Sequence, residues 1–215
     1  MYASRDASLS LLCRRWRYNV GGNLIKRTEM FRRLYIRWLV WRGKAVDIWS
    51  KSEYPADVLS NLCSNGFRFD GMVCGSMEGF LQSLKQKDKD KQRQICSMKG
   101  KNAKKMTSTG WQTDQIVWWK GNPIDRQSAD YYSFVRAAYL AMFEQNERFR
   151  TALMSTRGMA LYHSRGEQNP YKTILTEREF CQILTELRDD YDKRDKHLGR
   201  IKIVFEEDGT EEVEG

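Results

Sequence analysis

Helical periodicity after residue 75 constrains the fold more than any other feature of this chain. Within residues 76–85, apolar side chains stand at i, i+3, i+4 and i+7, at Met77, Phe80, Leu81 and Leu84. That spacing places them on one face of an α-helix, because an α-helix has 3.6 residues per turn. The segment therefore predicts a helix that buries one face and leaves the other polar.

The same reasoning predicts four more helices. Residues 129–143 carry the strongest pattern, and Thr176 with Glu179 forms a T-x-x-E capping box that begins a last helix ending near Asp192. Polar residues 88–97 and residues 146–156 complete the set.

Strand signals are shorter and fewer. Residues 46–49 and 201–205 favour short strands, and residues 67–70 favour a strand that enters a turn at Gly71. Residues 52–66 are typical of a structured loop, whereas residues 30–42 suit either a helix or a strand. We therefore expect a mostly helical α+β chain with a few short strands.

Length limits the chain to one domain with additions, or to two small domains at most. A chain of 215 residues is long enough to bury a core and short enough to be a single domain. We expect a basic N-terminal extension over residues 1–44, a main domain over 45–192, and a C-terminal strand with an acidic tail over 193–215. No run of about 18 apolar residues occurs, so we expect no transmembrane helix.

Charge is distributed unevenly along the chain. The net charge is +9, from 37 Lys and Arg against 28 Asp and Glu. Residues 1–44 and 85–105 carry local excesses of +9 (11 − 2) and +7 (9 − 2), whereas the tail after Phe205 carries −6. A basic body favours a polyanionic partner such as nucleic acid, although a solvated basic face without a partner has the same composition.

Cysteine and histidine usage indicates neither a metal nor a cofactor. The five cysteines, at 13, 63, 74, 96 and 181, show no ligand spacing, and only two histidines occur. Unpaired cysteines are typical of a reducing compartment, so we expect a cytoplasmic protein.

Three chemically active side chains share one helix face. Glu78, Gln82 and Lys85 stand at i, i+4 and i+7 on the predicted helix 76–85, away from its apolar stripe. The helix therefore presents a carboxylate, an amide and an amine together. An ordinary solvated face with a polar i, i+4 pair has the same spacing.

This stretch resembles the signature of the NADAR (YbiA-like) family. That family has a Ser-Asn loop, a strand and a turn, and then an S-x-E-x-x-x-Q-x-x-K helix, which match Ser60-Asn61, residues 67–71 and residues 76–85. Residues 102–106, 139–149, 161–164 and 183–188 resemble later family segments in the same order. The resemblance covers residues 45–190.

The resemblance implies a glycohydrolase. It implies an α+β fold with a pocket for an ADP-ribose-like nucleotide and cleavage of the N-glycosidic bond between ADP-ribose and guanine in nucleic acid, which opposes ADP-ribosyltransferase toxins. Two other functions stay open: an N-glycosidase for a riboflavin-pathway intermediate, and a module that binds ADP-ribose or nucleic acid without turnover.

Site residues follow from the resemblance. Glu78 is the expected proton shuttle or water-orienting group, and Lys85 the expected Schiff-base former or phosphate clamp. The expected substrate-binding residues are Ser60, Asn61, Gln82, Trp118, Trp119, Arg126, His163 and Gly166.

Asn169 departs from the family pattern. The family often has an Asp there, and an amide cannot act as a general base, although it can bond a ribose hydroxyl. Either Glu78 then carries all of the acid–base work or activity is reduced. Glu167 is a nearby substitute two residues away.

Overall fold

The structure is a computed structural model that describes residues 29–207, with side chains described for residues 29–193. The basic extension up to residue 28 and the acidic tail from residue 208 lie outside the described residues. The chain divides into two compact units, with the boundary between Ala45 and Val46. In the first unit, residues 29–41 form a helix, which settles the choice between helix and strand there.

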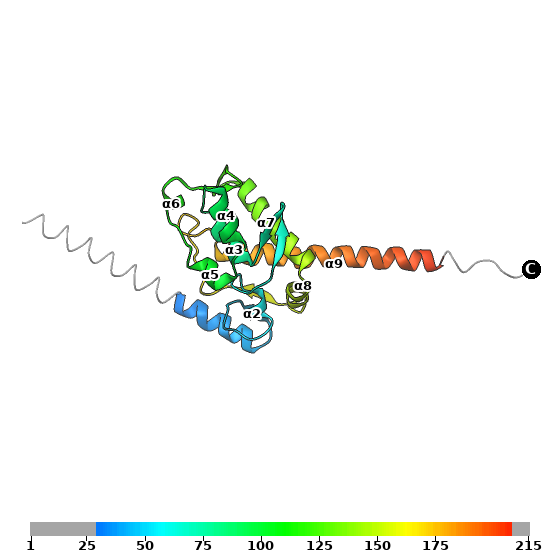
Figure 1. Ribbon diagram of the computed structural model, residues 1–215. Coiled ribbons are helices and arrows are strands. Elements are labelled where there is room, and N and C mark those ends of the chain that lie inside the picture. The colour runs from blue at the N-terminus through cyan, green and yellow to red at the C-terminus, as the bar shows by residue number, and fades with distance from the viewer. Residues whose placement is uncertain (1–28, 208–215) are drawn as a thin grey trace, which may run out of the picture. The chain divides into compact units, whose positions relative to one another are not determined.

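The second unit is a mixed α+β domain, as the sequence predicts (Figure 1). Its elements, in chain order, are β1 (Ala45–Asp47), α2 (Ala56–Leu59), β2 (Phe67–Phe69), β3 (Met72–Cys74), α3 (Met77–Ser83), α4 (Lys89–Cys96), α5 (Gly100–Lys104), α6 (Trp111–Asp114), β4 (Ile116–Trp119), β5 (Asn122–Asp125), α7 (Ala129–Gln145), α8 (Glu147–Met154), β6 (Ala160–Tyr162) and α9 (Glu177–Glu207). The first residue of β1 closes the first unit.

Strands of the described chain pair only two at a time. β1 pairs with β6, and β2–β3 and β4–β5 form antiparallel hairpins. Both hairpins turn through two residues with positive φ, Asp70 and Gly71 in one and Lys120 and Gly121 in the other, which suits the right-handed twist of the strands. The Lys120 ammonium and Asp70 carboxylate lie 2.8 Å apart, so the two turns are joined.

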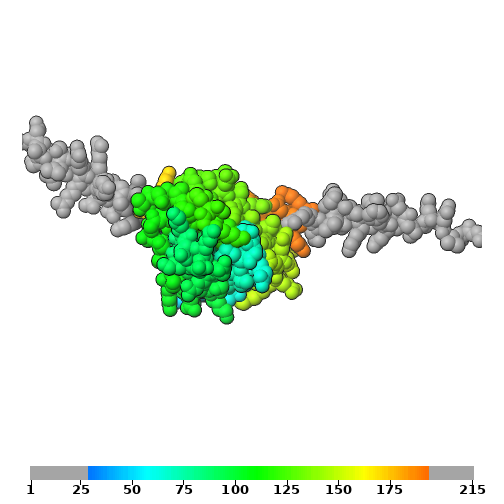
Figure 2. All heavy atoms as spheres, turned by 45° about the horizontal axis from the view of Figure 1, so that its top comes forward, coloured from blue at the N-terminus to red at the C-terminus, as the bar shows by residue number. Residues whose placement is uncertain are grey.

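Helix α3 lies at the centre of the helical layer. It packs against α4, α5 and β3, and its predicted apolar residues Met77, Phe80, Leu81 and Leu84 are all buried. Ser76 caps its first turn by accepting a hydrogen bond from the Gly79 amide at 3.0 Å. In the space-filling view, the green part of the chain that holds α4 to α6 covers most of the visible face (Figure 2).

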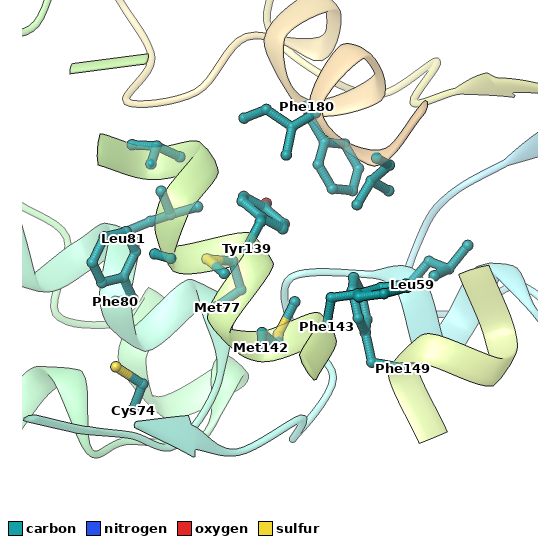
Figure 3. Close-up of a cluster of buried hydrophobic side chains, with 14 of the residues drawn as sticks. Leu59, Cys74, Met77, Phe80, Leu81, Tyr139, Met142, Phe143, Phe149 and Phe180 are labelled. Carbon is teal, nitrogen blue, oxygen red and sulfur yellow. The ribbon is translucent and has the colours of Figure 1, made fainter. Parts of the chain in front are cut away.

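Helix α7 connects this layer to the rest of the core. It packs against β2, β5, α8 and α9. Figure 3 shows Met142 of α7 beside Met77 of α3, and Phe143 beside Phe149 of α8. The core thus holds α3 rigidly from its apolar side, which leaves its polar side available for a site.

Two local predictions are wrong. Residues 52–66 are not entirely loop, since α2 forms within them, and residues 201–205 belong to α9 rather than to a strand. Leu198, Ile201 and Phe205 keep i, i+3, i+7 spacing, and extending an existing helix costs far less than starting a new element. The capping box is confirmed, because Glu179 N–H donates to Thr176 Oγ1 and Thr176 N–H donates to Glu179 Oε2.

Candidate functional site

Two adjoining cavities lie against the polar side of α3. One, here the Lys85 cavity, has a volume of about 270 Å³, and the other, the Trp49 cavity, about 200 Å³. We call the two together the cleft, because they share the lining residues Asn61, Glu78, Lys104, His163, Arg165 and Phe180. Gln82, Lys85, Gly166, Glu167 and Lys172 line only the Lys85 cavity, and Ile48, Trp49, Ser60 and Leu62 line only the Trp49 cavity.

Helix α3 supplies two of the three side chains that the sequence places on one face, Glu78 and Gln82, because the helix ends at Ser83 and Lys85 lies in the turn that follows. Glu78 lies between the two cavities, and Gln82 Nε2 donates to Glu78 Oε1 at 2.9 Å. This bond fixes the orientation of the carboxylate. The oxygen of the same amide, Gln82 Oε1, is buried without a hydrogen-bond partner. An orphaned acceptor in a cavity wall is a costly feature that a bound donor would satisfy.

Lys85 lies one turn further along, in a partly desolvated position. Burial lowers the pKa of its amine; the Glu78 carboxylate opposes that shift and the Lys104 ammonium adds to it. Its Nζ donates to Thr107 Oγ1 at 3.2 Å and lies 5.9 Å from the centroid of the Trp111 ring. An amine with a lowered pKa is neutral more often, and only the neutral amine is a nucleophile.

Asn61 joins the loop after α2 to two helices. Its backbone carbonyl accepts from the Glu78 amide at 2.9 Å, and its side-chain Oδ1 accepts from the Tyr139 phenol at 2.6 Å. With Oδ1 engaged, the Nδ2 group is the part of the amide left to donate to a ligand. Ser60, next to it, is nearly buried and caps the loop by accepting from Leu62 N–H at 3.3 Å.

The loop after β6 closes the other side of the cleft. His163 Nδ1 lies 2.6 Å from the Ile48 carbonyl, which makes Nδ1 the protonated nitrogen and leaves Nε2 as an acceptor. The buried Glu177 carboxylate accepts from His163 N–H at 3.1 Å through one oxygen and from the Gln168 amide through the other. Gly166 N–H donates to the His163 carbonyl at 2.7 Å, which makes the loop turn tightly.

Arg165 presents a flat cationic surface in this loop. Its guanidinium carbon lies 3.9 Å from the centroid of the Trp49 ring, so the two planar groups are in stacking contact. Arg165 lines both cavities, whereas Trp49 lines only one.

Positive charge predominates in the lining. Four cationic side chains, Lys85, Lys104, Arg165 and Lys172, face two carboxylates, Glu78 and Glu167. Hydrogen bonds from the Asn169 and Gln168 amides lower the pKa of Glu167, which keeps that carboxyl ionised. The lining therefore suits an anionic ligand. Its two carboxylates form a smaller region of negative charge that can transfer protons.

The predicted tryptophans lie away from the cleft. Trp119 is buried with Phe69, Phe80 and Phe134, and all ring-centroid distances in this cluster fall between 5.3 and 5.8 Å. Its indole N–H donates to Asp70 at 2.9 Å. Trp118 lies under the Lys87 ammonium, 4.7 Å from the ring centroid. Neither ring lines either cavity, because Trp119 packs into the core and Trp118 lies against Lys87, next to α4.

Arg126 is also placed elsewhere. It is 2% exposed, donates to both oxygens of Glu179 at 2.7 and 2.9 Å, and lies over the Tyr131 ring at 4.6 Å. These contacts occupy its guanidinium inside the protein. Its position supports α9 and the loop before it rather than a ligand.

Asn169 does not line the cleft either. Its side-chain oxygen accepts from the Tyr171 amide and its backbone N–H donates to Glu167, both at 2.9 Å. The residue thus shapes a turn that orients Glu167, whose carboxylate does line the Lys85 cavity. Of the eleven predicted site residues, seven line the cleft, namely Ser60, Asn61, Glu78, Gln82, Lys85, His163 and Gly166.

Sequence reasoning did not single out four side chains of this region. Trp49 lines the cleft from the loop after β1, Lys104 from α5, and Arg165 and Lys172 from the loop between β6 and α9. Arg165 follows the predicted His163 by two residues and Lys104 lies within a segment that resembles the family, so both positions carried a signal. Trp49 and Lys172 carried none that spacing could reveal.

Neither a metal centre nor a membrane span is found in the described residues. Among residues 29–193, no group of three or more His, Cys, Asp and Glu side chains is placed to hold a metal ion. The described helices include none with the length and apolar character needed to cross a membrane.

A comparison with protein-family models shows the family of this chain. Residues 53–189 match the family model described as bacteriophage protein GP30.3. An uncharacterized 17.1 kDa protein from the Gp30–rIII intergenic region of Enterobacteria phage T4 is 35% identical over 147 residues, which cover 67% of this chain and 97% of the relative. The solution structure of the Escherichia coli protein YbiA aligns with 71% of this chain and 88% of its own at 17% identity and a TM-score of 0.48.

Proposed function

Because the chain belongs to the bacteriophage GP30.3 family, which is of the NADAR type, we propose that it releases ADP-ribose from ADP-ribosylated guanine in nucleic acid. NADAR-type families are generally N-glycosidase-like, which supports a hydrolase as the general class of enzyme. The finer assignment to an ADP-ribosyl-guanine bond is our proposal, and so are the nucleic-acid substrate and an ADP-ribosyltransferase toxin as its opponent.

One observation carries the proposal: a carboxylate on α3 and a partly desolvated amine just after α3 line one cavity, whose other charges are mainly positive. Glu78 and Lys85 line the same cavity, and Lys104 and Lys172 line it with them. A binding module for ADP-ribose needs the cations but has no use for a nucleophile with a lowered pKa. The pair therefore favours turnover over binding alone.

In the proposed reaction the bond between ribose C1 and the guanine nitrogen breaks. Glu78 in its acid form gives a proton to the departing nitrogen while the sugar ring opens. The neutral Lys85 amine adds to C1 as the protonated base leaves. One amine proton passes to the ring oxygen, and the bond between Lys85 and C1 becomes a protonated imine. Water, deprotonated by Glu78, then adds to C1 and returns the amine, so that one water is consumed and ADP-ribose and the free base are released.

Lys104, Lys172 and Arg165 complete the assignment as ligands for the diphosphate. Their charges line the cleft on the sides that α3 does not occupy. Asn61 Nδ2 and the Gln82 oxygen are placed to bond ribose hydroxyls, since one is a donor and the other a buried acceptor without a partner. His163 Nε2 offers a second acceptor from the opposite wall.

The test is release of ADP-ribose from a guanine-ADP-ribosylated oligonucleotide, quantified by mass spectrometry. Glu78→Gln keeps the shape of the side chain and removes proton transfer, so kcat should fall by about 10²- to 10⁴-fold. Glu144→Gln, an exposed position on α7, is the matched control and should behave as wild type.

Two results would overturn the proposal. No release by the wild-type protein would exclude the reaction, and riboflavin-pathway intermediates would then be tested. Equal release by wild type and Glu78→Gln would remove Glu78 from the chemistry.

A further inference from the structure

Helix α5 forms one wall of the cleft and is fixed there by its backbone. A Cβ at Gly100 would lie 2.2 Å from the Leu62 carbonyl oxygen and 2.4 Å from the Leu62 Cα, so only glycine permits this approach. Leu62 lines the Trp49 cavity, and Ala103 of α5 is fully buried. The helix therefore cannot move away from the cleft without breaking the packing at both residues.

The outer side of α5 is a row of lysines. Lys101, Lys104 and Lys105 fall within about 100° of one another around the helix axis, and all three are exposed. Lys104 lines both cavities, so the row begins inside the cleft and continues onto the surface.

Within residues 29–193, no acidic side chain neutralises this row. None of the three lysines has an ion-pair partner among the described residues. The sequence from residue 91 to residue 113 contains six Lys and Arg and no Asp or Glu. Such an unbalanced row next to a cleft is a surface on which a chain of phosphates releases counterions.

The stacked pair across the cleft supplies the second element. The Arg165 guanidinium carbon lies 3.9 Å from the Trp49 ring centroid, and both residues line the Trp49 cavity together with Lys104. Bases of single strands stack on aromatic rings and on arginine planes, whereas the stacked bases of a duplex cannot reach them.

We infer that the α5 lysine row and the Arg165–Trp49 stack form a binding surface for a single-stranded polynucleotide that crosses the mouth of the cleft. This inference deepens the proposed function, on which it rests for the occupant of the cleft. Lys101 and Lys105 bind phosphates of the strand, while Lys104 between them stays with the diphosphate in the cleft. The stack holds an unpaired base against its planar face beside the residue that enters the cleft, and the N–H groups at the edge of the Arg165 plane remain for the diphosphate.

Binding of unmodified oligonucleotides tests this surface without requiring turnover. The probe is a fluorescein-labelled 15-nucleotide single strand of mixed sequence, prepared as DNA and as RNA, and titrated with the full-length protein at several salt concentrations. Fluorescence anisotropy gives Kd, and the slope of log Kd against log salt reports the number of phosphates neutralised.

Lysine variants should change both Kd and the slope of log Kd against log salt. The double variant Lys101→Gln/Lys105→Gln should weaken binding by roughly tenfold at low salt and reduce the salt slope by about 1.4, because each phosphate contact on a single strand contributes about 0.7. The matched control Lys91→Gln/Lys193→Gln removes the same charge from exposed positions that do not line the cleft, and should leave the slope nearly unchanged.

The stack is tested at constant charge. Arg165→Lys keeps the cation and removes the plane, so the single strand should bind roughly tenfold more weakly while the salt slope stays the same. A duplex of the same sequence should bind more weakly than either single strand and should not distinguish Arg165→Lys from wild type.

Three outcomes would overturn the inference: no binding of either single strand by the wild-type protein at low salt, unchanged binding by the lysine double variant, or equal binding of duplex and single strand. None of these depends on hydrolysis. A protein that binds the single strand as described and releases no ADP-ribose would refute the proposed function and leave this surface standing.

Discussion

The phenol of Tyr139 donates a hydrogen bond of 2.6 Å to Oδ1 of Asn61, and the backbone carbonyl of Asn61 accepts from the amide of Glu78 at 2.9 Å. Burial raises the pKa of Tyr139 well above its usual value, which keeps the phenol protonated and therefore a hydrogen-bond donor. One buried tyrosine on α7 thus fixes the orientation of an amide in the cleft and, through it, the loop that meets the start of α3.

Tyr139→Phe removes that orientation while keeping the ring in the core. The free energy of unfolding should fall by about 1 kcal/mol, and KM for ADP-ribosylated oligonucleotide should rise about fivefold because the Asn61 amide is free to rotate. Tyr132→Phe is the control, since its phenol donates to Glu186 at 3.1 Å outside the cleft. An unchanged KM in Tyr139→Phe would show that the amide orientation does not matter for the ligand.

Lys85 should give the reaction a characteristic pH dependence. Because burial lowers its pKa, the neutral amine is populated at lower pH than for an ordinary lysine, so the limb of the kcat profile that reports Lys85 should rise with pH and end below 10.5. Lys85→Arg keeps the charge but cannot form an imine, and should lose turnover while still binding ADP-ribose in calorimetry.

Borohydride distinguishes the two roles of Lys85. Reduction during turnover should attach ADP-ribose to Lys85, detectable as a mass increase on the peptide that contains it. Turnover by Lys85→Arg, or the absence of any adduct, would instead indicate that the ammonium only binds phosphate.

Gly166→Ala should disturb the loop after β6. The added Cβ would lie 2.6 Å from His163 Cδ2 and 2.9 Å from Glu177 Cβ, so the histidine ring must shift. We expect a loss of about 1–3 kcal/mol in stability by chemical denaturation, together with weaker ADP-ribose binding. Gly110→Ala, where the nearest atom is 4.0 Å away, should change neither quantity.

The Arg126–Glu179 pair should matter for stability and not for the ligand. Arg126→Met leaves the Glu179 carboxylate without its bidentate partner, which should cost about 3–5 kcal/mol and lower Tm by roughly 10 °C. Arg157→Met, at an ion pair with half-exposed side chains, should cost at most about 1 kcal/mol. A loss of ADP-ribose affinity in folded Arg126→Met would return Arg126 to the binding site.

Local sequence patterns predicted what local spacing controls. The helix predicted at 76–85 and its buried stripe follow from one periodicity, and the structure has the stripe on a helix that runs from Met77 to Ser83. Lys85 lies beyond the end of that helix and still lines the same cavity as Glu78 and Gln82. The capping box at Thr176 succeeded for the same reason, since its donors and acceptors lie three residues apart.

Long-range contacts account for what was missed. Arg126 looks like a phosphate ligand until Glu179, 53 residues away, is found against it. Trp119 looks like a stacking group until the hairpin β4–β5 places it among Phe69, Phe80 and Phe134. Arg165 and Trp49 become a pair only because β1 and β6 are neighbours in the fold.

Glu177 ties both ends of the segment from His163 to Gln168, and Asp47 fastens Ser164 through the Ser164 amide at 2.8 Å and the hydroxyl at 2.6 Å. The residues between these hydrogen bonds carry the side chains that face the cleft, whereas the hydrogen bonds themselves join the segment to the rest of the protein. The cleft-facing side chains of this segment can therefore be exchanged while the contacts that hold it to the domain remain. Libraries that vary Arg165 and Glu167 with Glu177, Asp47 and Gly166 held constant would explore ligand preference without rebuilding the domain.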